Sequence, residues 1–200
     1  MPPNQWQQFL NRLSRDLLAD PELSEQLPDE VFDSGWLGFS PATENEIQAT
    51  ENRLGKKLPP SLRSFYEVTN GWRCVGCFIW NILPVGEVGW LPETVPHLFK
   101  IAQDVEETKG PFEKDPGGRR LRDHRNEQGT RVKRSLVITS EGDASHWLLD
   151  PETINTKGEW AGGRWSSWNP AMSWNADSFA DLVRDEYETF LKLTADRQDS

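Results

Sequence analysis

The sequence of 200 residues is poor in cysteine, with only Cys74 and Cys77. Two cysteines cannot form a disulfide framework, so a reducing compartment is the simpler interpretation. No window of about 18 apolar residues occurs, which argues against a membrane-spanning helix. The N-terminal residues also lack the basic and apolar regions of a signal peptide. We therefore expect a protein that remains in the cytoplasm.

Common catalytic motifs are also missing. The chain has no Gly-x-Gly-x-x-Gly and no phosphate-binding Gly-Lys-Ser/Thr. Asp143, Ser145 and His146 are close in sequence, but no Gly-x-Ser-x-Gly surrounds the serine, and neighbouring side chains of a strand point to opposite faces. The sequence therefore does not predict a hydrolase triad, and we expect no catalytic residues.

The spacing of Cys74 and Cys77 is that of a zinc knuckle or a redox pair. A zinc site needs two more ligands, and the only histidines are the widely separated His97, His124 and His146. A redox pair lies at the start of a helix, whereas apolar, strand-like residues follow Cys77. We interpret both cysteines as structural and expect no metal and no cofactor.

Basic residues are outnumbered, with 22 Lys and Arg against 32 Asp and Glu and a net charge of −10. This balance argues against binding to nucleic acid or to an anionic membrane and suits a basic protein partner. Residues 113–134 are the exception, with eight basic and four acidic side chains. We interpret that segment as a mobile basic loop, with contact to a partner as the alternative.

Apolar periodicity predicts a helix near each end of the chain. The N-terminal face consists of Trp6, Phe9, Leu10, Leu13 and Leu17. The C-terminal face consists of Phe179, Leu182, Val183 and Phe190, with Asp177 or Ser178 as the cap. Between residues 20 and 42, prolines and glycines leave room for one short helical turn. We therefore expect a helical extension over 1–35, a domain over 36–194 and a tail over 195–200.

Residues 43 to 71 carry clear signals for helix ends. Thr43 and Glu46 fit a reciprocal capping box, and Gly55 suits a left-handed helix end onto which Leu58 folds back. A second helix follows Pro59 and Pro60, with Leu62, Phe65 and Tyr66 on one face, and Asn70-Gly71 closes it. This stretch is therefore predicted to be a two-helix scaffold without chemistry of its own.

The spacing of apolar residues changes from helical to strand-like after Gly71. Residues 72–90 predict one or two short strands, and residues 94–107 predict a helix with Pro96 in its first turn. Residues 135–140 and 145–150 form a predicted hairpin, followed by a further turn and strand over 151–160.

Taken in order, these elements resemble the SMI1/KNR4 family of the SUKH superfamily, over residues 36 to 192. In the first part the resemblance is carried by Pro41, Ile47, Leu54, Gly55, Leu58, Pro59, Leu62, Phe65, Tyr66, Asn70 and Gly71. In the later part it is carried by Val137, Ile138, Gly142, Asp143, Leu148, Leu149, Asp150, Gly158, Glu159, Trp160, Ser178 and Phe179. Residues 1–35 and the basic segment depart from the family pattern.

The resemblance implies an α+β fold in which an antiparallel-rich sheet is flanked by helices from both ends of the chain. Bacterial members resemble immunity proteins that bind and neutralise a toxin, often a nuclease. Fungal members are regulators that bind several partners in cell-wall signalling. Neither branch implies catalysis, so the resemblance favours a noncatalytic protein-binding domain.

The predicted partner surface lies on the later strands, because residues 141–200 carry twelve acidic and five basic side chains beside several tryptophans. Its residues are Asp150, Glu152, Glu159, Trp165 and Trp168. Structural roles are predicted for Leu54, Gly55, Leu58, Pro59, Tyr66, Asn70, Gly71 and Trp160. Three alternatives remain. The carboxylates serve solubility only, the tryptophans, with Trp174, cover the sheet edge and the base of the last helix, or these tryptophans form a sugar-binding or enzymatic platform.

Overall fold

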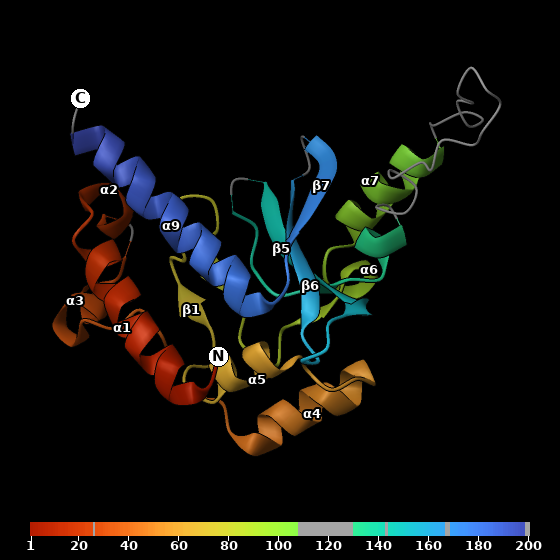
Figure 1. The fold of residues 1–200 in the computed structure, drawn as a ribbon, viewed down its shortest axis with the longest axis horizontal. Helices are drawn as coiled ribbons and strands as arrows, with labels where there is room; N and C mark the ends of the chain where they lie inside the picture. The colour runs from red at the N-terminus through yellow and green to blue at the C-terminus, as the bar shows by residue number, and fades with distance from the viewer. Residues whose placement is uncertain (26, 108–129, 143, 167–168, 199–200) are drawn as a thin grey trace.

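A five-stranded antiparallel sheet separates two groups of helices in this computed structural model (Figure 1). The structure describes residues 1–25, 27–107, 130–142, 144–166 and 169–198. In spatial order the strands are β3 (Gly89–Trp90), β4 (Leu136–Val137), β5 (Ser145–Ile154), β6 (Trp160–Ser166) and β7 (Asn169–Ala176). A separate two-stranded ribbon consists of β1 (Trp72–Arg73) and β2 (Asn81–Ile82).

The larger group of helices comprises α1 (Pro3–Leu18), α4 (Glu44–Leu54), α5 (Pro60–Tyr66) and α9 (Phe179–Gln198). Of these, α9 contacts β6 and β7 of the sheet, and α5 contacts both α1 and α9. Trp147 and Leu149 of β5 join their apolar side chains in the main core. Gly162 of β6 allows close approach of α9, since a Cβ there would lie 2.7 Å from Cδ1 of Leu182.

The opposite sheet face is covered by α6 (Leu91–Thr94) and α7 (Pro96–Glu107). Leu148 points to this side, as alternation along β5 requires, and packs with Leu91, Leu98 and Val137 in a second core. The predicted α+β fold is therefore confirmed: helices from both chain ends flank an antiparallel sheet. None of the described helices combines the length and apolar character needed to cross a bilayer.

Three of the four predicted helix ends between residues 43 and 71 are confirmed, but α5 ends at Tyr66 and not at Asn70-Gly71. The amide of Glu46 donates to Oγ1 of Thr43 at 3.3 Å, and the amide of Thr43 donates to Oε2 of Glu46 at 2.7 Å. Gly55 has φ of 67° after α4, and Leu58 is buried in the main core. Gly71 has φ of 102°, whereas the side chain of Asn70 accepts the amide of Val85 at 2.7 Å.

Replacing Gly55 with alanine is expected to lower the free energy of unfolding by about 1 kcal/mol, because an L-residue is strained in the left-handed region. No neighbouring atom lies within 4 Å of an added Cβ at Gly55, so strain alone is tested. Gly86 is the matched control, since its surroundings are equally open and its φ is not in that region. Urea unfolding that shows equal costs for Gly55→Ala and Gly86→Ala would contradict this assignment.

The N-terminal extension differs from expectation in its connecting segment. Two short helices form there, α2 (Pro21–Ser24) and α3 (Asp29–Ser34), where one helical turn was predicted. Asp20 caps α2 by accepting the amides of Glu22 and Leu23, and Gly35 ends α3 with φ of 65°. Short local caps of this kind stabilise a single turn that apolar periodicity does not reveal. The division of the chain at residue 35 stays a prediction.

Later elements also differ in detail. Residues 72–90 hold three two-residue strands, and α6 precedes the helix predicted from residue 94. The 135–150 hairpin is confirmed, with Leu136 opposite Leu149. The last helix is capped by Ser178, whose Oγ accepts the amide of Asp181 at 3.2 Å, and it runs through residues 195–198, which were predicted as tail. Residues 113–129 of the predicted mobile basic loop lie outside the described residues, whereas residues 130–133 are helical, so the prediction is wrong for that part.

Candidate functional site

Three of the five predicted partner-binding residues are buried. Asp150 is fully buried, where it pairs with Arg131 through Nε at 2.7 Å and with Arg134 through Nε at 2.7 Å and Nη2 at 2.8 Å. Burial alone would raise the pKa of Asp150, but hydrogen bonds from these arginines, Thr153 and the amide of Glu152 hold it well below its ordinary value. Asp150 therefore organises the protein interior, and its predicted exposure is wrong.

Glu159 is also turned inward. Its carboxylate accepts the amide of Ser61 at 3.0 and 3.2 Å and the hydroxyl of Ser61 at 2.7 Å. Ser61 lies in the first turn of α5, where backbone amides have no partner within the helix. Glu159 thus supplies the hydrogen-bond acceptor for a first-turn amide of α5, although the two residues are far apart in sequence. The expectation of an exposed carboxylate is wrong here too.

The tryptophans of β6 are covered on both sheet faces. Trp160 is buried in the main core, as predicted, and Trp165 is 1% exposed in the second core. Because helices cover both faces, neither side of this strand reaches solvent at these positions. The expected exposure of Trp165 is therefore wrong, and Trp160 and Trp165 do not form a sugar-binding platform. Trp168 lies outside the described residues.

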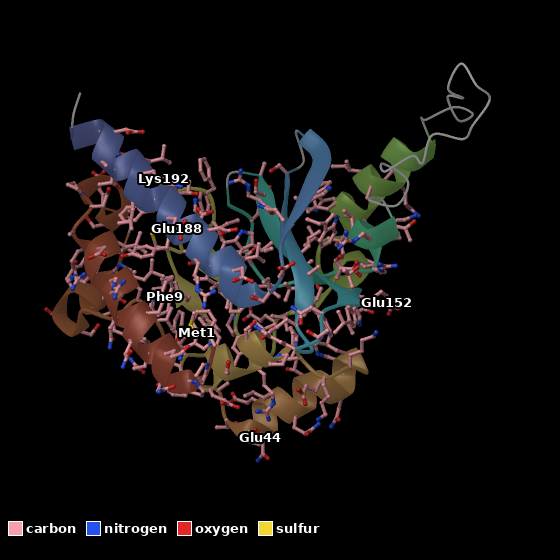
Figure 2. The ribbon with its side chains drawn as sticks, in the orientation of Figure 1. Met1, Phe9, Glu44, Glu152, Glu188 and Lys192 are labelled. Atoms are coloured by element: carbon pink, nitrogen blue, oxygen red, sulfur yellow. The ribbon has the colours of Figure 1, made fainter. Side chains whose placement is uncertain are left out.

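Glu152 is the predicted partner residue that does lie at the surface. Its carboxylate pairs with Nζ of Lys56 at 2.8 Å, and this contact lowers the pKa of Glu152. Figure 2 labels Glu152 beside the sheet, on the side away from α1, α2 and α3. Its partner role stays a prediction.

Glu159 also lines a hollow of about 420 Å³ at the start of α9. The hollow is polar, and its lining includes the basic Lys157 and Arg184 and the acidic Asp177 and Asp181. Since charges of both signs line it, the hollow offers no field of one sign to a charged ligand.

A stronger concentration of charge lies on α2 and α3. Residues 20–33 carry six acidic and no basic side chains, and Glu25, Asp29 and Asp33 are exposed. Among the described residues these three have no ion-pair partner within 4.0 Å. A like-signed cluster of this kind attracts cationic groups of a partner and raises the association rate. With Phe32 and Phe39, these carboxylates make up what we call the α3 surface.

Two aromatic rings lie exposed within the α3 surface. Phe32 is 47% exposed and Phe39 is 40% exposed. The guanidinium of Arg73 lies 3.8 Å from the ring centre of Phe39 and also contacts Glu30 at 3.3 Å. The surface therefore combines apolar area with carboxylates, as protein interfaces commonly do at their centre and rim.

Sequence reasoning missed the α3 surface because it weighed acidic residues and tryptophans only in residues 141–200. The signal was present, since residues 20–33 contain Phe32, six carboxylates and no basic residue. The sequence could not show that Val31 is buried and Phe32 exposed, because a helix this short has no apolar periodicity that marks its buried side.

The described residues offer little nucleophilic chemistry. Burial raises the pKa of Cys74 to about 12 and also raises the pKa of Cys77, so both thiols stay protonated at neutral pH. Oγ of Ser145 hydrogen-bonds Oγ of Ser166 at 2.6 Å, and His146 faces Thr139 instead. Within the ranges that the structure describes, no group of three or more His, Cys, Asp or Glu side chains is arranged to hold a metal ion.

His146 is buried, with Nδ1 3.1 Å from the carbonyl oxygen of Thr139, and its Nε2 has no hydrogen-bond partner among the residues that the structure describes. Burial lowers the pKa of His146, the carbonyl of Thr139 and Glu141 oppose this change, and His97 adds to it. The unfolded chain therefore takes up a proton at a higher pH than the native protein. Stability that is full above about pH 6.5 should decline as the pH falls below that value.

Urea unfolding between pH 7 and pH 5 checks this expectation. His146→Asn should reduce the loss of stability on acidification, because asparagine does not take up the proton. His97→Asn is the matched control, since His97 is exposed and that variant should keep most of the loss. An unchanged pH slope in His146→Asn would show that His146 is not the titrating group.

Comparison with known proteins places the fold within a described family. A family model described as "SMI1 / KNR4 family (SUKH-1)" matches residues 41–185, well over half of the chain. No curated protein matches the sequence. The matched span contains α4, α5 and every strand of the described residues, and it excludes α1, α2 and α3.

Proposed function

The chain belongs to the SMI1/KNR4 family (SUKH-1), and from this premise we propose that it is an immunity protein that binds and neutralises a toxin domain. Membership supports a protein-interaction domain of the immunity type at the level of the family. The family match is the observation that carries the proposal. Neutralisation requires only that the bound protein cover the active surface of the toxin, so no catalytic group is needed.

The proposed partner is a basic domain, and a nuclease fits this description best. A nuclease must hold the phosphates of a polyanion, so its active surface is basic. The net charge of −10 complements such a surface and would accelerate the encounter. An interface of about 1,600 Å² in total, near 800 Å² on each partner, is a usual size for a tight protein inhibitor. We place this binding in the cytoplasm of the cell that makes the chain.

Affinity capture and growth assays test the proposal together. The full chain, carrying an affinity tag, is used to capture its partner from the cells that make it, and the partner is identified by mass spectrometry. The captured domain is then expressed in a host with and without the chain. The proposal predicts that the domain stops growth alone and that co-expression restores growth. Capture of several nontoxic signalling proteins would instead favour a regulatory interaction module.

A further inference from the structure

We propose that the α3 surface is the docking surface for a basic protein partner, and that Phe32 is its aromatic anchor. This inference rests on the proposed function and adds the location of the contact. Residues 20–39, which supply the surface, lie outside the family-matched span of 41–185. The partner would therefore be recognised by a part of the chain that the family model does not include.

The α3 surface rests on a fixed base formed by the two ends of the chain. Tyr187 of α9 donates to Oδ2 of Asp16 at 2.5 Å, and its ring contacts Phe9 edge-on with centroids 5.5 Å apart. Figure 2 labels Phe9 where α1 and α9 face each other. Arg197 near the end of α9 pairs with Asp20 at 2.7 Å and also with Glu22. These contacts hold α1 and α2 in place, and Val31 anchors α3 in the main core, so little ordering is needed when a partner binds.

Helix geometry places the charges of α3 on its outward side. Val31 is 1% exposed and marks the inward side. At about 100° per residue, Asp29 and Asp33 then lie nearly opposite Val31, while Phe32 and Glu30 lie on the two flanks. All four acidic and aromatic residues of α3 are exposed. The outward side is therefore a carboxylate ridge with an aromatic ring beside it.

This arrangement selects one class of partner. Lys and Arg side chains around an apolar patch would meet the carboxylates and Phe32 together, which suits the surface of a basic protein. A second copy of the chain would place the same carboxylates against each other, because a two-fold interface is self-complementary. An anionic membrane or a nucleic acid would be repelled for the same electrostatic reason.

Charge reversal at two sites compares the α3 surface with the opposite side of the molecule. The test variant is Asp29→Lys with Asp33→Lys, and the control is Glu93→Lys with Glu152→Lys. Both pairs are exposed carboxylates and change the net charge equally, and the control also removes the exposed ion pair of Glu152 with Lys56, which contributes little to stability. With the captured toxin domain, we expect the test variant to associate about tenfold more slowly at low salt, and the control close to the wild-type rate.

A separate pair of variants tests the aromatic part of the α3 surface. Phe32→Ala should raise the dissociation rate about tenfold, as loss of an aromatic anchor at an interface commonly does. Trp80→Ala is the control, because Trp80 is 58% exposed and is not part of the α3 surface. Circular dichroism and urea unfolding of every variant show whether the native fold is kept. If Asp29→Lys/Asp33→Lys and Phe32→Ala bind like wild type while the control pair loses binding, the α3 surface is wrong and the proposed function stands.

A probe independent of any toxin separates the two proposals. Cytochrome c, a small basic protein, is incubated with the full chain at low salt and joined to it by a zero-length carbodiimide cross-linker. The inference predicts that the cross-links concentrate at Glu25, Asp29 and Asp33. Such a result without a toxic partner in the capture experiment would leave the α3 surface standing and overturn the proposed function. Cross-links spread evenly over exposed carboxylates would overturn the α3 surface.

Discussion

Asp150→Ala is expected to lower the free energy of unfolding by about 3 kcal/mol or more, because it removes the carboxylate from a buried ion-pair cluster. Arg131 and Arg134 both donate to Asp150, as does the hydroxyl of Thr153 at 2.7 Å. Without the carboxylate, two partly buried guanidinium groups would face each other unpaired. Urea unfolding followed by circular dichroism measures the loss.

The neighbouring Glu152→Ala is the control for this prediction. Glu152 also pairs with a cation, but Lys56 and Glu152 are both well exposed, so the variant should stay close to wild type. The depressed pKa of Asp150 adds a second test. Its contribution is full above the unfolded pKa near 3.8 and is lost as the pH falls below that value. Wild-type stability of Asp150→Ala would contradict the buried cluster.

Trp6→Ala should lower the free energy of unfolding by about 3 to 5 kcal/mol, the usual range for removing a buried large aromatic side chain. Trp6 is fully buried, and its Nε1 donates to the carbonyl of Ser61 at 3.0 Å. Its ring contacts Phe65 and Phe179 with centroids 5.4 and 5.6 Å apart. Although Trp6 precedes the family-matched span, it thus packs between α5 and α9.

Trp80→Ala provides the matched control, because the same side chain is removed from an exposed position and a small effect is expected. Thermal and urea unfolding of Trp6→Ala should each give one transition, shifted to lower stability. A separate early transition, with the remainder of the protein at wild-type stability, would show that α1 is an independent extension.

Local features of the fold were predictable from the sequence. The capping box at Thr43 and Glu46, the left-handed Gly55 and the buried face of α1 depend on residues a few positions apart. Helix caps and apolar periodicity record such short-range relations directly. These signals were sufficient to place α1, α4, α5 and α9 and to indicate the 135–150 hairpin.

Long-range partners were not predictable in the same way. Glu159 accepts from Ser61, nearly one hundred positions earlier, and Asp150 pairs with arginines from a segment interpreted as a solvated loop. These carboxylates were predicted to lie at the surface because residues 141–200 have an excess of acidic side chains. Burial of Trp165 has a similar cause, because it depends on α6 and α7 covering a second sheet face. Composition alone therefore could not show which of these side chains lie at the surface and which are buried.

Titration of the toxin's activity tests the proposed function most directly. Purified chain is added in increasing amounts to a fixed quantity of the purified partner domain, and the remaining activity is measured at equilibrium. Inhibition by covering an active surface predicts that activity falls in proportion to added chain and reaches its minimum at one equivalent. Full activity in excess chain would contradict neutralisation by binding. Complete loss of activity at a small fraction of one equivalent would contradict a noncatalytic mechanism.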